Sequence, residues 1–104
     1  MNDGADGLKE AYRRTIIDLL AENPHVEQVV LFGSWARHNF RPQSDIDLAL
    51  FGEALTMADL VELHRRLEET TIPQRVDLVL ASTIDDPQLL RHIREAGRLW
   101  FSRR

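Results

Sequence analysis

The sequence predicts a single-domain α/β (or α+β) fold, in which helices pack on a small sheet. Three short stretches rich in Val, Leu and Ile, at about 27–32, 45–51 and 75–81, have the length and composition of strands. Between and around them, apolar residues recur at helical spacing. The order helix, strand, short helical turn, strand, helix, strand, helix is typical of a sheet covered by helices. With 104 residues, 43% of them hydrophobic, the chain can bury one modest core, so we expect one domain over 1–104.

The first half of the chain begins with a polar, glycine-containing segment, 1–7, which we expect to be disordered. A helix then extends to about Glu22, because apolar residues repeat every three or four positions: Leu8, Tyr12, Ile16, Leu19 and Leu20. Asn23-Pro24 ends this helix. After the first strand we expect a short helical turn over 34–37 and a polar loop over 39–44.

The second half carries two helix-start signals. Thr56 and Asp59 have the spacing of a capping box, ahead of a helix with Leu60, Leu63 and Leu67. A loop over 70–74 precedes the third strand. Asp86-Pro87 then matches an N-cap and first helical residue, and the last helix should bury Leu89, Leu90 and Ile93. Gly97 is placed to end or bend this helix.

An apolar tail, Leu99-Trp100-Phe101, lies near the C-terminus. It offers either a docking surface for a partner protein or a segment that folds back onto the first helix. The sequence leaves both interpretations open.

Composition excludes several classes of protein. The net charge of −4 supplies no general positive field, which argues against nucleic acid as a partner. The absence of cysteine excludes disulfides and thiolate zinc sites. No apolar run has the length of a membrane span and no basic-then-apolar leader opens the chain, so we expect a cytoplasmic location without membrane contact. The glycine-lysine and glycine-rich nucleotide motifs of P-loop and dinucleotide-binding proteins are absent.

The pair Gly33-Ser34 stands where the first strand ends. Glycine lets a backbone approach a bulky anion, and a serine opening a short helix offers a hydroxyl and an N–H group to a phosphate. Arg37, three residues further on, could add a charge-assisted contact to the same anion. The alternative is an ordinary strand-to-helix turn with serine as its N-cap.

Asp45 and Asp47 open the second strand and alternate with Ile46. Because strand side chains alternate between faces, both carboxylates should emerge on the same side. They would repel each other unless a cation lay between them, and Mg²⁺ favours such oxygen ligands. The alternative is a solvated strand start, since this spacing is common by chance among nine aspartates.

Asp77 interrupts the apolar third strand, where an unpaired charge is costly. If the third strand lies beside the second, Asp77 reaches the same metal centre as Asp45 and Asp47. There it would serve as a ligand and as the base that takes a proton from an attacking hydroxyl. The alternative is an ion pair with Arg75, which is two residues away and on the same strand face.

The segment from Gly33-Ser34-Trp35-Ala36-Arg37 to Arg41-Pro42-Gln43-Ser44-Asp45-Ile46-Asp47-Leu48 resembles a known signature, GS-x10-D-x-D, of the nucleotidyltransferase superfamily. Its details are similar to those of the minimal nucleotidyltransferase branch. The resemblance implies a polymerase-β-like core, a small mixed sheet flanked by helices, with ATP as substrate and magnesium, two ions, as cofactor. It implies that Gly33 and Ser34 hold the triphosphate and that Asp45, Asp47 and Asp77 are the catalytic metal ligands.

The resemblance also implies a partner. Members of this branch are typically encoded beside a HEPN-domain toxin and act as its antitoxin, forming a hetero-oligomer and transferring AMP to a tyrosine of the toxin. Two other functions stay open. The chain could neutralise its partner by complex formation with little or no catalysis, or it could be a nucleotidyltransferase with a small-molecule acceptor.

Overall fold

The computed structural model describes residues 10–33, 35, 36 and 44–103. Along the chain the elements are α1 (Glu10–Ala21), β1 (Gln28–Phe32), β2 (Ile46–Phe51), α2 (Met57–Glu68), β3 (Val76–Leu80), the 3-10 helix η1 (Ala81–Thr83), α3 (Pro87–Ala96) and β4 (Arg98–Ser102). The predicted mixed α/β fold is confirmed. The expected disordered start, 1–7, lies outside the described residues, and of the turn expected over 34–37 only Trp35 and Ala36 are described.

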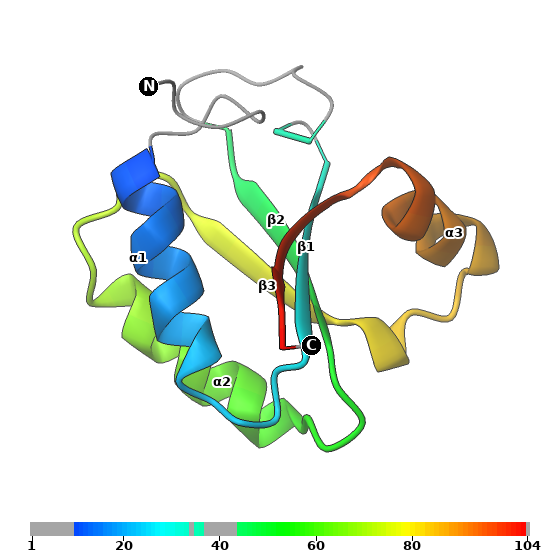
Figure 1. Ribbon diagram of the computed structural model, residues 1–104, viewed down its shortest axis with the longest axis horizontal. Coiled ribbons are helices and arrows are strands. Elements are labelled where there is room, and N and C mark those ends of the chain that lie inside the picture. Colours follow the sequence, from blue (N-terminus) through cyan, green and yellow to red (C-terminus); the bar gives the residue numbers. More distant parts are fainter. Residues whose placement is uncertain (1–9, 34, 37–43, 104) are drawn as a thin grey trace.

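The four strands form one mixed sheet in the order β3-β2-β1-β4 (Figure 1). β1 pairs antiparallel with β2 on one side and with β4 on the other, whereas β2 and β3 are parallel. The C-terminal end of β1 therefore lies at the same end of the sheet as the starts of β2 and β3. All three predicted acids and Gly33 belong to this end.

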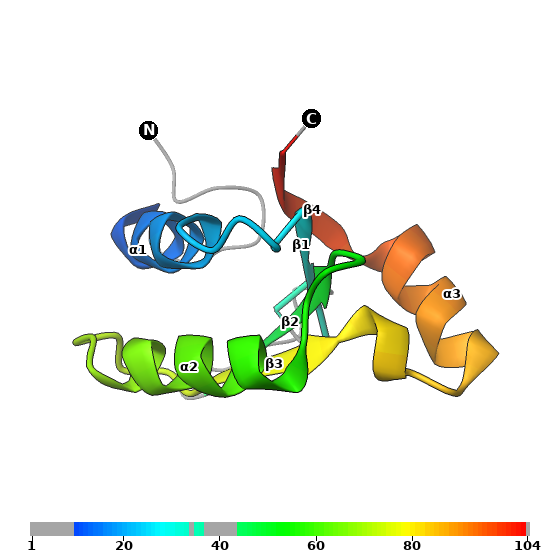
Figure 2. The same cartoon turned by 90° about the horizontal axis from the view of Figure 1, so that it is seen from below.

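The two faces of the sheet are covered unequally (Figure 2). Helices α1 and α2 pack on one face, where inward residues of the strands join them in the main hydrophobic core: Ile16, Leu20, Val29, Leu31, Ile46, Leu48, Leu50, Leu63, Leu67, Val76 and Leu80. Of the described helices of α type, α3 alone lies on the other face, over a smaller core of Val30, Ala49 and Ile93. Since side chains alternate along each strand, Asp47 and Asp77 belong to this second, less covered face.

The predicted helix starts are confirmed. The Thr56 side chain accepts from the backbone N–H of Asp59, and the Asp59 carboxylate accepts from the backbone N–H of Thr56, so the capping box is complete. Asp86 caps α3 and Pro87 is its first residue, while Gly97 is its C-cap. No helix in the described part of the chain combines the length and apolar character that crossing a membrane would require.

The prediction for the buried face of α3 was wrong at one position. Ile93 is fully buried, but Leu89 is 39% exposed. The reason is the tilt of the helix: its C-terminal end approaches β1, where Gly97 lies against Val30, and its first turn diverges from the sheet (Figure 2). The spacing of apolar residues identifies which side of α3 faces the sheet. It does not show how much of the helix length is in contact with the sheet.

The interpretation of residues 99–101 as a tail was also wrong, because they belong to β4 at the edge of the sheet. Trp100 is buried in the main core together with Ile16 and Leu20 of α1, so the fold-back alternative describes its position better than a docking surface does. Leu99 remains 58% exposed. A register shift opposite Val29 and Val30 breaks the regular alternation in β4, which removes the pattern by which a strand is recognised.

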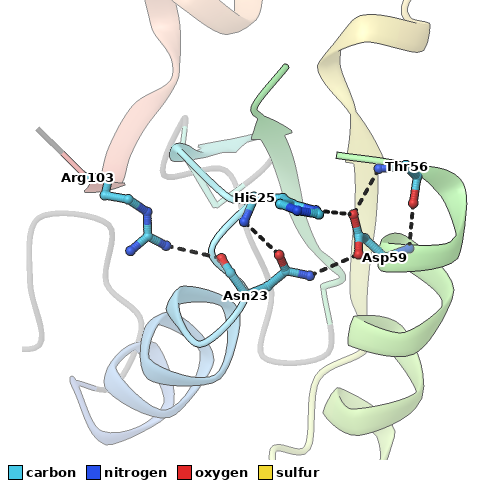
Figure 3. Close-up of polar contacts among 5 residues, drawn as sticks. All are labelled: Asn23, His25, Thr56, Asp59 and Arg103. Carbon is cyan, nitrogen blue, oxygen red and sulfur yellow. Dashed lines mark hydrogen bonds and ion pairs between the residues drawn. The ribbon is translucent and has the colours of Figure 1, made fainter. Parts of the chain in front are cut away.

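A polar network ties the end of α1 to the start of α2 (Figure 3). Asp59 accepts from the Asn23 amide at 3.2 Å, and its Oδ2 lies 3.0 Å from His25 Nδ1. Arg103 donates to the carbonyl oxygens at the end of α1 and in the following turn: Ala21, Asn23 and Val26. The contact to Ala21 satisfies a carbonyl group in the last turn of α1, which has no partner inside the helix, and the other two fix the turn that follows.

Candidate active site

Gly33 brings the backbone directly against the carboxylate of Asp47. Strand β1 ends at Phe32, which pairs with Asp47 across the sheet, and Gly33 follows with φ +80°, a left-handed conformation that favours glycine. A Cβ atom built at Gly33 would overlap Asp47 Oδ2. The glycine is therefore needed both for the turn and for the closeness of the acid. Ser34 and Arg37, the other predicted phosphate-binding residues, lie outside the described residues.

Asp47 and Asp77 are direct neighbours in the sheet. They are register partners in the parallel pair β2–β3, so both side chains leave the same face. Neighbouring strands lie about 4.8 Å apart, which places the two carboxylates side by side. Asp45 precedes β2 by one residue and is exposed; Ile46, between the two acids, is buried. The strand thus begins one residue later than predicted, and Asp45 immediately precedes it.

The pKa of Asp47 is raised by its surroundings, including the neighbouring acids. Partial burial, followed by repulsion from Asp77 and then from Asp45, raises the pKa of the Asp47 carboxyl from 3.8 to about 6. A cation bound beside Asp47 would favour its charged form, so this carboxylate is a candidate metal ligand.

Asp77 also makes the ion pair that the sequence offered as an alternative. Arg75 Nε donates to Asp77 Oδ1 at 3.0 Å. The two side chains are 72% and 39% exposed, and exposed pairs of this kind contribute little to stability. The pair and the proximity of Asp77 to Asp47 coexist, so Arg75 compensates one side of the acid pair.

The side chains of the described residues do not form a metal centre as they stand. Among the described residues, no group of three His, Cys, Asp or Glu side chains is arranged to hold a metal ion. The acids lie at one end of the sheet, but the predicted convergence of Asp45, Asp47 and Asp77 on one point is not seen. One oxygen of Asp77 is turned toward Arg75 instead.

Two further residues make contacts that hold the turn after Gly33, and the sequence analysis missed both. Trp35 Nε1 donates to the carbonyl oxygen of Ser44 at 3.0 Å, and Arg98 Nε donates to the carbonyl oxygen of Ala36 at 3.1 Å. The only signal for Trp35 in the sequence is a large apolar residue within a short turn. Arg98 gives no signal, because its contact depends on the unpredicted strand β4.

The family description "Polymerase beta, Nucleotidyltransferase" matches residues 14–104 of this chain. Two similar proteins of Methanocaldococcus jannaschii carry the name protein adenylyltransferase. One is 37% identical over 73 residues, which are 69% of this chain and 76% of that protein. The other is 31% identical over 78 residues, 74% of this chain and 79% of that protein.

Solved structures show the same fold. A toxin–antitoxin crystallised with AMP-PNP gives a TM-score of 0.73 at 27% identity, covering 86% of this chain and 73% of that one. A minimal nucleotidyltransferase gives 0.67 at 31% identity, covering 85% and 88%. The toxin–antitoxin MntA–HepT gives 0.67 at 25% identity, covering 89% and 72%. The expected polymerase-β-like fold is confirmed, and the chain belongs to the polymerase-β nucleotidyltransferase family.

Proposed function

We propose that this chain is a magnesium-dependent nucleotidyltransferase that transfers AMP from ATP to a hydroxyl group of a partner protein. The observation that carries the proposal is the placement of Asp47 and Asp77 at one register position beside the Gly33 turn. The partner we propose is a HEPN-type toxin modified on a tyrosine, with this chain as its antitoxin in a hetero-oligomer. The names of the relatives, protein adenylyltransferases and toxin–antitoxin pairs, support this assignment.

Asp45, Asp47 and Asp77 are the residues that would hold Mg²⁺, two ions in our proposal. The donor set fits, because carboxylate oxygens are the ligands that Mg²⁺ prefers and it needs few of them beside water and phosphate oxygens. The raised pKa of Asp47 fits as well, because burial and the neighbouring acids Asp77 and Asp45 disfavour its charged form, which a bound cation would favour. When bound, Mg²⁺ neutralises the triphosphate and favours ionisation of the attacking hydroxyl.

The protein residues supply position and a proton acceptor. The turn at Gly33 exposes backbone at the exit of β1, and we assign Gly33, Ser34 and Arg37 to the triphosphate. Asp77 is the group we assign to accept the proton of the acceptor hydroxyl. The bond formed joins that oxygen to the α-phosphorus, the bond broken joins the α-phosphorus to the bridging oxygen, and pyrophosphate leaves with the bond electrons.

A second candidate function is neutralisation of the partner by binding alone. It is favoured by the ion pair with Arg75, which occupies one oxygen of Asp77, and by the lack of three side chains arranged to hold a metal ion among the described residues. In that case the protein would form a stable complex with the toxin and add no AMP to it.

The test is a transfer assay with the protein encoded by the neighbouring gene. The two proteins are incubated with Mg²⁺ and ATP labelled in its α-phosphate, and the partner is then examined by mass spectrometry. We expect one or more AMP adducts, which the double variant D45N/D47N should abolish. The matched control is D18N/D85N, which removes the same charge at two exposed positions away from the site. Tight complex formation without any adduct would support the second candidate function, and equal labelling by D45N/D47N would contradict the site.

A further inference from the structure

We infer that Trp35 is a positioning residue for this site, whose indole N–H fixes Asp45 relative to the Gly33 turn. The inference rests on the proposed function, since it concerns how well the site holds Mg²⁺ and nucleotide. It concerns a contact between two points of the chain that the sequence separates by nine residues.

The contact is a part-buried hydrogen bond made by a buried indole ring. Trp35 is only 3% exposed and belongs to the main core with Leu31, Ile46 and Leu48. Its Nε1 donates to the Ser44 carbonyl oxygen at 3.0 Å. A side chain packed this tightly occupies one rotamer, so its N–H points in a fixed direction.

This hydrogen bond joins two segments that each adjoin a proposed site residue. Trp35 follows Gly33 by two residues, and Ser44 immediately precedes Asp45. Consecutive Cα atoms are about 3.8 Å apart, so holding the Ser44 carbonyl constrains where Asp45 emerges. The bond thus joins the proposed phosphate-binding end of the site to the proposed metal-binding end.

A second anchor holds the same turn from the other side. Arg98, paired with Leu31 at the start of β4, donates from Nε to the Ala36 carbonyl oxygen at 3.1 Å. The turn after Gly33 is therefore attached to the edge strand through Ala36 and to the entrance of β2 through Trp35. With both attachments in place, the spacing between Gly33 and Asp45 is set by the folded core.

Tryptophan suits this task because it combines a large apolar body with one N–H donor. Phenylalanine would occupy most of the same space and lack the donor. Replacing Trp35 with phenylalanine therefore removes the hydrogen bond while keeping most of the packing. Groups that orient metal ligands typically change metal affinity by about 10- to 100-fold when they are removed.

The experiment compares W35F with W100F in the full-length protein. Both variants make the same chemical change in the same core, and Trp100 lies in β4 outside the proposed site. The measurement is the Mg²⁺ concentration at half-saturation, obtained by calorimetry at a fixed concentration of AMP-PNP. We expect W35F to raise it about tenfold or more, and W100F to leave it within about twofold of the wild type.

The outcomes separate this inference from the proposed function. Unaltered Mg²⁺ dependence in W35F, with normal binding by the wild type, would overturn the role of Trp35 alone. Failure of the wild type to bind Mg²⁺ with AMP-PNP would overturn the proposed function itself. Both variants are first compared by thermal unfolding, because a general loss of structure would affect binding without any role in positioning.

If W35F does not fold, the native side chain serves as its own probe. The chain has two tryptophans, so W100F leaves Trp35 as the only one. We expect Mg²⁺ with AMP-PNP to change the fluorescence of Trp35, because its N–H is bonded next to a proposed ligand. An unchanged spectrum at saturating Mg²⁺ and AMP-PNP would contradict the inference.

Discussion

Asp47 and Asp77 are register partners on the parallel strands β2 and β3, so their carboxylates leave the same face of the sheet as neighbours. Gly33, at the exit of the adjacent strand β1, has no Cβ and thereby admits the carboxylate of Asp47. The Asp47 carboxyl responds to burial and to Asp77 with a pKa raised to about 6.

Replacing Gly33 with alanine should impair both stability and AMP transfer. The residue has φ +80°, and an added Cβ would overlap the Asp47 carboxylate. Such backbone strain costs about 1–3 kcal/mol. We expect a lower free energy of unfolding by urea denaturation and at least about a tenfold loss of transfer, because the acid must move.

The cause can be separated by a double-mutant cycle with D47A. Removing the carboxylate relieves the overlap and leaves the strained φ angle, so G33A should destabilise the D47A protein less than the wild type. Strictly additive free energies would show that Gly33 and Asp47 do not interact.

The variant D47N should stabilise the metal-free protein while abolishing transfer. A carboxyl whose folded pKa is raised above its unfolded value contributes stability below about pH 4 and loses it as pH rises through about 6. At pH 8 in EDTA, removing the charge should therefore increase the free energy of unfolding by about 1–2 kcal/mol, allowing for partial exposure.

At about pH 3 the stability difference between D47N and the wild type should nearly disappear, because the wild-type carboxyl is then largely protonated in both the folded and the unfolded states. The exposed Asp18 on α1 provides the control, and D18N should show no such dependence on pH. A D47N protein that is less stable than the wild type at pH 8 would contradict the proposed repulsion.

Asp59 should show the opposite dependence on pH. Hydrogen bonds from His25, the Thr56 backbone and Asn23 hold the pKa of its carboxyl at about 2, below its usual value of 3.8. A depressed pKa contributes stability above about pH 4 that is lost as pH falls toward 2. The D59N protein should be less stable than the wild type at pH 7 and nearly equal to it at pH 2, as measured by urea denaturation. A constant difference across this range would show that the network does not favour the charged carboxylate.

Removing the charge of Arg75 should tighten Mg²⁺ binding. Arg75 occupies one oxygen of Asp77, and the exposed pair contributes less than about 1 kcal/mol to stability. In R75Q we expect an unfolding free energy close to that of the wild type and a several-fold lower Mg²⁺ concentration at half-saturation with AMP-PNP. R65Q, on the exposed surface of α2 among Glu62 and Glu69, is the matched control. If R75Q and R65Q bind Mg²⁺ equally, Asp77 is a partner of Arg75 only.

Much of the architecture could be predicted from local signals. The strand at 45–51 and the capping box at Thr56 and Asp59 appear in the structure within a residue of their predicted bounds, because their patterns reflect chemistry of adjacent residues. Strand β4 was missed because its apolar residues do not alternate and because its pairing with β1 depends on contacts distant in sequence.

In the candidate site too, local signals could be predicted and contacts between distant parts of the sequence could not. Alternation predicts that Asp45 and Asp47 point the same way, but only the pairing of β2 with β3 places Asp77 beside Asp47. The hydrogen bond from Trp35 to Ser44 could not be predicted, because the sequence does not show that these two residues, nine positions apart, lie in contact. The sequence analysis offered the ion pair of Asp77 with Arg75 as an alternative to a metal site. Residue spacing could not show that Asp77 makes this ion pair and also lies beside Asp47.

The most direct test of the account is AMP transfer by the D77N variant. Asp77 is the residue whose role depends most on the fold, because it joins Asp47 only across the parallel strands. Mass spectrometry of the partner protein, after incubation with ATP and Mg²⁺, should show AMP adducts with the wild type and none with D77N. Adducts formed by D77N at the wild-type rate would contradict the claim that Asp47 and Asp77 act as one catalytic unit.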